Sequence, residues 1–164
     1  MKRPEILRCD AMINYVGYWL ASGAPEKRKL LDECWRLTRE ALRAFEEGDN
    51  GSEYGKTYNQ LSNSVVFGFC LDWDFKARKK MLEEAVEHGE RTITFLSTLG
   101  KTSELAKAYA RTAFYLGAFC HYFPDTSVNE KNLQKSQDYW LRAKAFSEDL
   151  TLVELLYPVF GPQV

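Results

Sequence analysis

Histidine and cysteine are scarce in this sequence, and the short motifs that mark many active sites are missing. The 164 residues include two histidines, His88 and His121, and four cysteines. Cys120 and His121 are adjacent, so on a helix their side chains point in different directions and do not have the spacing of a zinc site. The sequence contains no phosphate-binding glycine loop, no serine nucleophile elbow and no His-Glu-x-x-His segment. We therefore expect no enzyme activity, no metal and no cofactor.

Long apolar runs and an excess of one charge are also missing. No apolar run approaches the roughly 20 residues that cross a bilayer, and residues 1–15 lack the apolar core and cleavage site of a secretion signal. The formal net charge is −1, so no overall field attracts an anionic membrane. The cysteines lie singly in apolar helical patterns, where free cysteine behaves as a small hydrophobic residue. We expect a cytoplasmic protein without a membrane partner.

Two short basic clusters, residues 27–29 and 76–80, raise the question of nucleic-acid binding. The second cluster is followed at once by Glu83, Glu84 and Glu87. Mixed-sign runs of this kind usually form solvated helix faces, and the balanced net charge gives no long-range attraction to phosphates. We do not expect nucleic acid to be a partner.

Sustained alternation of apolar and polar residues is absent from the sequence, so no strand is expected. Apolar residues recur instead at spacings of three and four, which is the pattern of amphipathic helices. With 45% hydrophobic and 27% charged residues, the chain has the composition of a globular protein and is expected to form one domain, residues 1–164. The expected fold class is all-α. The pattern predicts helices over residues 5–21, 25–47, 52–71, 75–99, 103–123 and 129–148.

Polar residues mark the starts of several predicted helices. Asp72 and Asp74 lack the glycine and the run of oxygen ligands of a calcium loop, so we interpret Asp74 as a helix cap. Ser52 is expected to cap the helix that follows it. The first helix is expected to bury a face made of larger apolar residues: Met12, Tyr15, Val16, Trp19 and Leu20.

The helix predicted at residues 103–123 has two apolar seams, one of small and one of large side chains. Because a small-residue seam lets a neighbouring helix come close, we expect an inner helix that is packed on more than one side. The small residues are Ala106, Ala110, Ala113 and Gly117, and the large ones are Leu105, Tyr109, Leu116, Phe119 and Phe123. A third line is left for solvent or a ligand: Lys107, Arg111, Phe114, Ala118 and His121.

The predicted helices repeat in pairs. A shift of 51 residues places Tyr58 on Tyr109 and Leu31 on Leu82, and a shift of 54 aligns the later residues in the same way. The pairs are expected to be antiparallel hairpins at about residues 5–47, 52–99 and 103–149, followed by a segment at 150–164.

The pattern inside these hairpins resembles tetratricopeptide repeats. It is carried by Ala-Lys-Ala-Tyr-Ala at 106–110, Tyr-Leu-Gly at 115–117 and Trp-Leu-Arg-Ala-Lys-Ala at 140–145. The period is longer than the usual 34 residues of that family, so the chain is similar to its long-helix variants. The resemblance implies a right-handed α-solenoid of three stacked hairpins with a short C-terminal helix.

The same resemblance implies a scaffold that binds a peptide or protein segment in a groove lined by the first helix of each hairpin. Lys107 and Arg111 lie four residues apart and can hold a carboxylate, so an acidic segment is expected, with Phe114 as an apolar anchor. The predicted groove residues are Asn14, Lys56, Gln60, Asn63, Lys107, Arg111, Phe114 and His121.

Some members of this family clamp a C-terminal carboxylate with basic and asparagine residues in these helices. Lys107 and Arg111 resemble the basic pair, with Asn59 or Asn63 for the amide, but Asp10 stands where the first helix would need a basic residue. The alternative is that Lys107 and Arg111 form a solvated face.

The last residues of the sequence are strongly apolar. Because the ends of a repeat stack must be covered, we expect this segment to cap the last hairpin, to dock on a neighbouring chain in a homo-oligomer, or to begin another element of a longer protein. The alternative function is therefore a structural or self-assembling module acting through its stack ends, or a domain of a larger regulatory protein. The residues concerned are Leu152, Leu155, Leu156, Tyr157 and Phe160.

Overall fold

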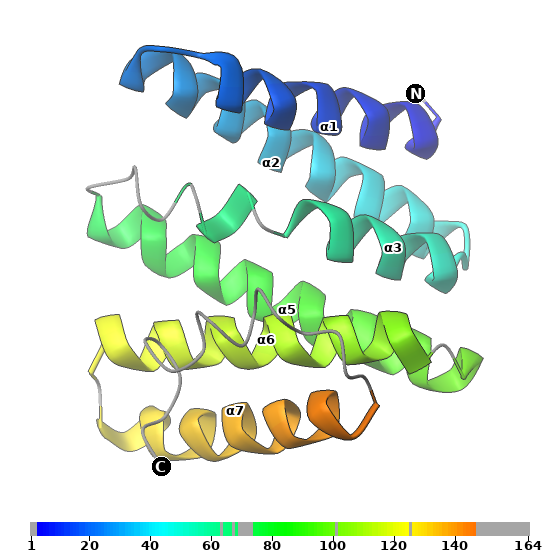
Figure 1. Ribbon diagram of the computed structural model, residues 1–164, viewed down its shortest axis with the longest axis vertical. Coiled ribbons are helices and arrows are strands. Elements are labelled where there is room, and N and C mark those ends of the chain that lie inside the picture. The colour runs from blue at the N-terminus through cyan, green and yellow to red at the C-terminus, as the bar shows by residue number, and fades with distance from the viewer. Residues whose placement is uncertain are drawn as a thin grey trace. The chain divides into compact units, whose positions relative to one another are not determined.

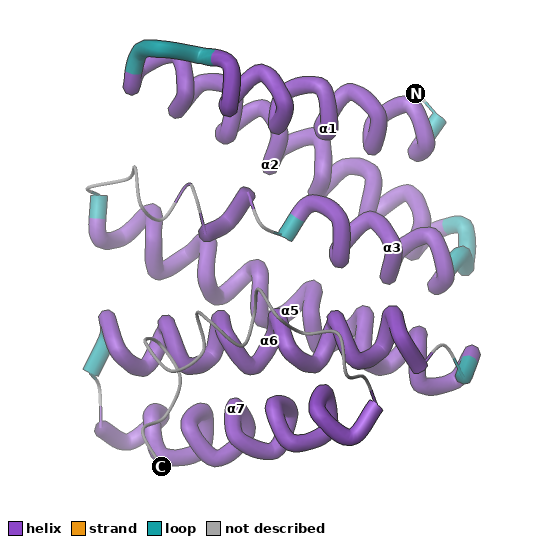
Figure 2. The backbone as a smooth tube through the Cα atoms, in the orientation of Figure 1, coloured by secondary structure: helices purple, strands orange, loops and turns teal. Residues whose placement is uncertain are grey.

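Six long helices make up most of the part of the chain that the structure describes (Figure 1). The computed structural model describes residues 3–62, 64–66, 68, 74–100, 102–124 and 126–146. Its helices are α1 (Pro4–Leu20), α2 (Ala24–Glu47), α3 (Gly51–Leu61), α5 (Phe75–Leu99), α6 (Thr102–Tyr122) and α7 (Thr126–Phe146). None of the described residues forms a strand (Figure 2). The all-α prediction is confirmed for this part of the chain.

Local signals set the starts of the helices close to where the sequence predicts them. A proline stands in the first turn of both α1 and α2, where its missing N–H costs nothing. Asp74 caps α5 as expected, because its Oδ1 accepts a hydrogen bond of 3.0 Å from the backbone N–H of Lys76. The cap of α3 differs from the prediction. It is Asn50 rather than Ser52, and its Oδ1 accepts from the backbone N–H of Glu53 at 3.2 Å.

The start of α7 lies at Thr126, three residues before the predicted Asn129. Asn129 has another role, because its Nδ2 donates a hydrogen bond of 3.1 Å to the backbone carbonyl oxygen of Phe123. This bond satisfies a carbonyl just beyond the end of α6, where the helix supplies no partner of its own. The predicted helix ends at residues 71 and 148 lie outside the described residues.

The chain divides into two compact units, Met1–Met81 and Leu82–Val164, and the division falls inside α5. The first and third predicted hairpins are packed pairs, since α1 packs along α2 and α6 packs along α7. The second predicted hairpin crosses the division. The sequence predicted one domain, and because α5 continues through the boundary without a break, its periodicity gives no sign of two units.

In the first unit, α2 packs against both α1 and α3. The apolar residues of this helix recur every three or four positions, which predicts a stripe on one side of it, and its buried face follows that stripe. A buried helix face of this kind is the main source of its stability, since short isolated helices are marginal in water. The residues of the stripe that are buried are Leu31, Cys34, Trp35, Thr38, Leu42 and Phe45.

The prediction of which face α1 buries was wrong. Ala11 is fully buried, and Gly17 lies against Leu30, so close that an added Cβ would be 3.4 Å from a Leu30 methyl carbon. Gly17 therefore faces α2, where its lack of a side chain allows the two helices to approach closely. The buried residues of α1 are Leu7, Ala11 and Tyr18, whereas Val16, Trp19 and Leu20 are exposed.

In the second unit, α6 is an inner helix, as predicted. All four residues of its small seam are buried. Ile93 of α5 and Ala143 of α7 belong to the same buried cluster as Leu105 and Tyr109 of α6, so α6 is packed on more than one side. Tyr139 and Trp140 of α7 are partly buried and pack against this cluster.

Candidate functional site

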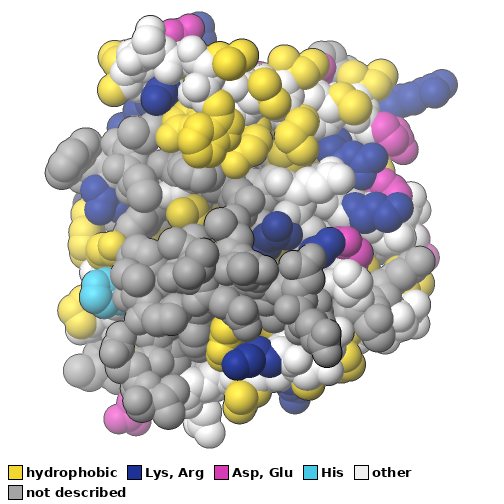
Figure 3. All heavy atoms as spheres, in the orientation of Figure 1, with side chains coloured by type: hydrophobic (Ala, Val, Ile, Leu, Met, Phe, Trp, Pro, Cys, Tyr) yellow, Lys and Arg dark blue, Asp and Glu magenta, His cyan; other side chains and the backbone are white. Residues whose placement is uncertain are grey.

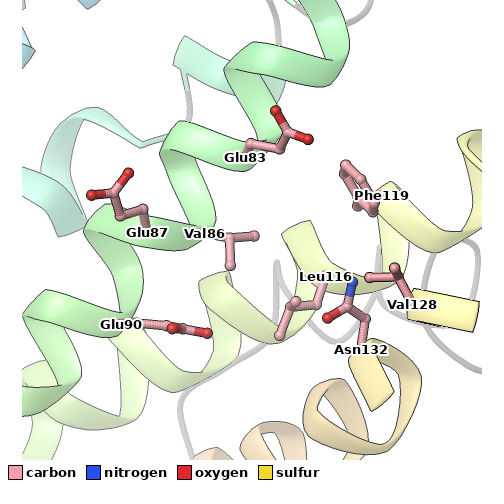
Figure 4. Close-up of a pocket in the computed structure, with 8 residues that line it drawn as sticks. All are labelled: Glu83, Val86, Glu87, Glu90, Leu116, Phe119, Val128 and Asn132. Carbon is pink, nitrogen blue, oxygen red and sulfur yellow. The ribbon is translucent and has the colours of Figure 1, made fainter. Parts of the chain in front are cut away.

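A pocket lies in the second unit, between α5, α6 and α7 (Figure 4). Its volume is about 320 Å³, and it is lined by acidic, apolar and amide side chains. The acids come from α5, the apolar residues mostly from α6 and α7, and the amide from α7. The lining residues are Glu83, Val86, Glu87, Glu90, Leu116, Phe119, Val128 and Asn132.

The acidic rim is produced by the spacing of three glutamates along α5. Glu83, Glu87 and Glu90 are four and three residues apart, which places them on one face of a helix. Figure 4 shows all three on the α5 side of the pocket, with Val86 between them. One wall of the pocket is therefore a line of carboxylates.

The three carboxylates differ in their partners. Glu90 forms an ion pair of 2.5 Å with Lys135, which joins α5 to α7. Glu87 pairs with Arg91 one turn later on the same helix, at 2.8 Å. Glu83 is exposed and has no hydrogen bond or ion pair within the described part of the chain. The rim thus keeps a negative charge that its own cations do not cancel.

The Glu90–Lys135 pair is held in a partly buried setting. Lys135 Nζ also lies 5.7 Å from the centre of the Tyr139 ring, within range of a cation–π interaction. Burial lowers the pKa of Lys135, but the hydrogen bond to Glu90 and the neighbouring charges outweigh it and raise this pKa above its ordinary value. Lys135 therefore stays charged at neutral pH, and its ion pair holds the Glu90 side chain beside the pocket.

The floor of the pocket is apolar. Leu116 is almost fully buried, whereas Phe119 is partly exposed and lies 5.2 Å from the Phe123 ring, measured between ring centres. Val128 of α7 is half exposed, at 50%. The side-chain amide of Asn132 forms no hydrogen bond within the described residues and can donate to or accept from a ligand backbone. Apolar contact and negative charge are thus available to one ligand.

The predicted groove residues of the first unit make mostly local contacts. Lys56 is exposed and its Nζ donates to Glu53, one turn earlier, at 2.6 Å. Asn14 donates from Nδ2 to the backbone carbonyl oxygen of Asp10 at 2.8 Å. Gln60 is exposed. The remaining predicted residue of this region, Asn63, lies outside the described residues.

The predicted groove residues of the second unit are all on α6. Lys107 is exposed and donates to Glu104 at 3.0 Å, and His121 is exposed with its ring edge-on to Tyr122 at 4.9 Å. Phe114 is only 6% exposed, which corrects the expectation of an accessible anchor. Because α6 is packed on more than one side, only a narrow line of its surface is exposed. Phe114 lies next to that line and not on it.

Arg111 is the most unusual of the predicted residues. Its Nη1 is buried and has no hydrogen-bond partner among the described residues. A buried guanidinium nitrogen without a partner is costly, and a carboxylate or carbonyl oxygen would satisfy it. This atom is the strongest structural support for an anion-binding position on α6. The predicted oligomer or capping residues 152–160 lie outside the described residues.

The pocket was not predicted from the sequence. Its glutamates on α5 were expected to form a solvated face, although their spacing next to Val86 gave a usable signal. What no local pattern could show is that Val128 and Asn132, some forty residues later in the chain, lie opposite them. That arrangement depends on how α7 packs along α6.

Comparisons with other proteins add no assignment. No protein-family model, curated protein or solved structure matches this chain. Within the described ranges, no group of three or more His, Cys, Asp or Glu side chains is placed to hold a metal ion. None of the helices described above combines the length and the apolar character needed to cross a bilayer.

Proposed function

We propose that this chain is a protein-interaction module that binds a basic, partly apolar peptide segment in the pocket of its second unit. The observation that carries the proposal is the lining of that pocket, where Glu83 and Glu87 lie beside Val86, Leu116 and Phe119. The module belongs, in this proposal, to the long-helix variants of tetratricopeptide-like repeats with a right-handed solenoid. The packing of adjacent helices, α1 on α2 and α6 on α7, supports this.

Lysine and arginine side chains suit such a pocket. Their methylene stems pack on apolar surface while the charged head reaches a carboxylate. Glu83 forms no ion pair among the described residues, so it can accept a ligand charge without breaking an existing pair. The volume of about 320 Å³ is near the lower end of ligand pockets, roughly 300 to 1,000 Å³. It fits one or two side chains of a bound segment.

A random peptide library displayed on phage tests the proposal without a known partner. The full chain is immobilised, and peptides that contain lysine or arginine next to apolar residues are expected to be enriched. A synthetic peptide from the enriched set should lose about tenfold or more in affinity with the E83K/E87K double variant, because attraction becomes repulsion. Its affinity should also fall as salt is added, since exposed charges are screened.

A matched control separates the pocket from overall charge. Glu26 and Glu47 are exposed residues of α2, outside the pocket, and E26K/E47K changes the net charge by the same amount. This control should bind the peptide as the wild type does. Selection of peptides without basic residues, or equal loss in both double variants, contradicts the proposal.

A second candidate is the acidic segment expected from the sequence, bound along the exposed line of α6. The buried and unpartnered Nη1 of Arg111 favours it, together with the exposed Lys107 four residues earlier. The same library distinguishes the two candidates. Enrichment of acidic peptides whose binding is lost with K107Q/R111Q and kept with E83K/E87K would replace the first candidate by the second.

A further inference from the structure

The outer face of α1 is almost entirely apolar and exposed. The exposed fractions are 47% for Ile6, 68% for Ile13, 50% for Val16 and 81% for Leu20, and Cys9 is exposed as well. We call these five residues the α1 stripe. In Figure 3, apolar side chains gather along the part of the surface where Figure 1 places α1. Single exposed apolar residues are normal, but a continuous line of them marks an interaction site.

The spacing of the α1 stripe indicates what kind of partner covers it. Its residues are separated by three, four, three and four positions, which is the spacing of a helix that packs lengthwise against another helix. The stripe extends for about 21 Å at a rise of 1.5 Å per residue. The buried residues of α1 are different ones, Leu7, Ala11 and Tyr18. The stripe is therefore a second seam, free for another helix.

A second copy of this chain supplies a helix with the matching pattern. The stripe has Ile13 at its centre, with Cys9 and Val16 on either side and Ile6 and Leu20 at its ends. A two-fold axis through Ile13 would therefore place Ile6 against Leu20 and Cys9 against Val16 of the other copy. Contacts of this self-complementary kind are the ones that closed dimers use.

Charge decides the relative direction of the two helices. Glu5 and Asp10 flank the stripe in its first half, whereas residues 11–21 carry no charge. In a parallel pair, Glu5 of one copy would lie beside Asp10 of the other, and like charges at these flanking positions repel. In an antiparallel pair, both acids face the uncharged half of the other helix. The antiparallel arrangement avoids the repulsion.

We propose that the α1 stripe is the interface of an antiparallel homodimer. The inference does not depend on the peptide-binding pocket, which lies in the other unit. A contact between two helices of this length is smaller than the standard interface of about 1,200 to 2,000 Å². The dimer is therefore expected to dissociate on dilution.

Light scattering and sedimentation equilibrium of the full chain test the dimer. The mass should rise with concentration from 19.0 kDa toward twice that value. The I13K variant should stay at the mass of one chain at every concentration, with unchanged circular dichroism, because Ile13 is 68% exposed in the single chain. L141K is the matched control, since Leu141 of α7 is 64% exposed and lies outside the stripe. It should dimerise as the wild type does.

A monomeric wild type, or equal loss of dimer with I13K and L141K, overturns the proposal. Disulfide cross-linking then tests the direction, with all chains carrying C70S. Oxidation should give a covalent dimer for V16C, through Cys9 of one copy and the new cysteine of the other, whose side chains lie close enough only in the antiparallel pair. The C9S/V16C chain should not cross-link. Two results overturn the antiparallel arrangement. One is a cross-linked dimer of the chain that keeps Cys9 and has no V16C substitution, and the other is a V16C chain that does not cross-link.

Discussion

The hydroxyl of Ser136 in α7 donates a hydrogen bond of 2.7 Å to the backbone carbonyl oxygen of Ala113 in α6, and both residues are fully buried. The two residues are 23 positions apart in the chain, so the bond joins helices rather than turns of one helix. It fixes how α7 lies along α6. The same packing brings Val128 and Asn132 to the pocket.

Removing this bond should weaken the second unit. The S136A variant is expected to lower the free energy of unfolding by about 1 kcal/mol, the usual net contribution of a buried hydrogen bond. Urea denaturation followed by circular dichroism measures it. Thr94 is the control, because its hydroxyl bonds only within α5 and is exposed. T94A should change stability by less than about 0.5 kcal/mol, and an equal effect of the two variants would contradict the role given to Ser136.

The small seam of α6 should not accept larger side chains. Ala110 is fully buried, and an A110L substitution must insert three more carbon atoms into a packed core. We expect a loss of about 1 to 3 kcal/mol in unfolding free energy, measured by denaturant titration. The same change at Ala145, which is exposed on α7, should be nearly neutral. If A110L is as stable as A145L, the close approach of helices along this seam is not required.

The ion pair between Arg8 of α1 and Glu53 of α3 predicts a pH dependence of the first unit. The two side chains are 2.6 Å apart, and both are less than a quarter exposed. The hydrogen bond from Lys56 lowers the pKa of Glu53, burial opposes this shift, and Arg8 lowers the pKa further. A lowered pKa in the folded state means that the stabilisation is present above the ordinary glutamate pKa and is lost as the pH falls through the folded-state value.

The E53Q variant should therefore be less stable than the wild type at pH 7, by about 0.5 kcal/mol. The difference should disappear in acid, once the wild-type carboxyl is protonated. Urea titrations at pH 7 and below pH 3 provide the comparison. E47Q, at an exposed position near the end of α2, should show no difference at either pH. If E53Q is still less stable than the wild type in acid, the effect comes from the changed shape of the side chain and not from its charge.

The described cysteines should differ sharply in reactivity. Burial raises the pKa of Cys34 to about 11 and that of Cys120 to about 11, so both thiols stay protonated and shielded at pH 8. Cys9 is exposed. In a C70S chain, at a concentration low enough for the α1 dimer to dissociate, a thiol reagent such as DTNB should label one cysteine quickly in the native state and three after denaturation. Fast labelling of two or more native thiols would contradict this burial.

Much of the fold was predictable because helix periodicity and capping are local. The pattern of α2 is clear enough that its stripe was identified correctly, and Asp74 was recognised as a cap. The face of α1 was predicted wrongly because this helix has two apolar faces. Ile13 lies on one of them and Ala11 on the other, and periodicity shows only that both are apolar. The face of α1 that packs on α2 is the one whose small residues let α2 come close.

The candidate site was less predictable because it depends on packing between helices. The spacing of Glu83 and Glu87 gives one wall of the pocket, but the other walls come from α6 and α7. The predicted anchor Phe114 illustrates the same difficulty. Phe114 lies on the same side of α6 as exposed residues such as Lys107. Its burial depends on the helices that pack against α6, which the sequence of α6 alone does not show.

The nearly complete burial of α6 has a consequence for how the second unit opens. Between Leu105 and Cys120, only Lys107, Arg111 and Phe119 have side chains that are exposed or partly exposed. The amide hydrogens of this helix can exchange with deuterium only when a large part of the unit opens, since local fraying does not reach them. They should be the slowest amides in Leu82–Val164 to exchange, and their rates would report the global stability of that unit.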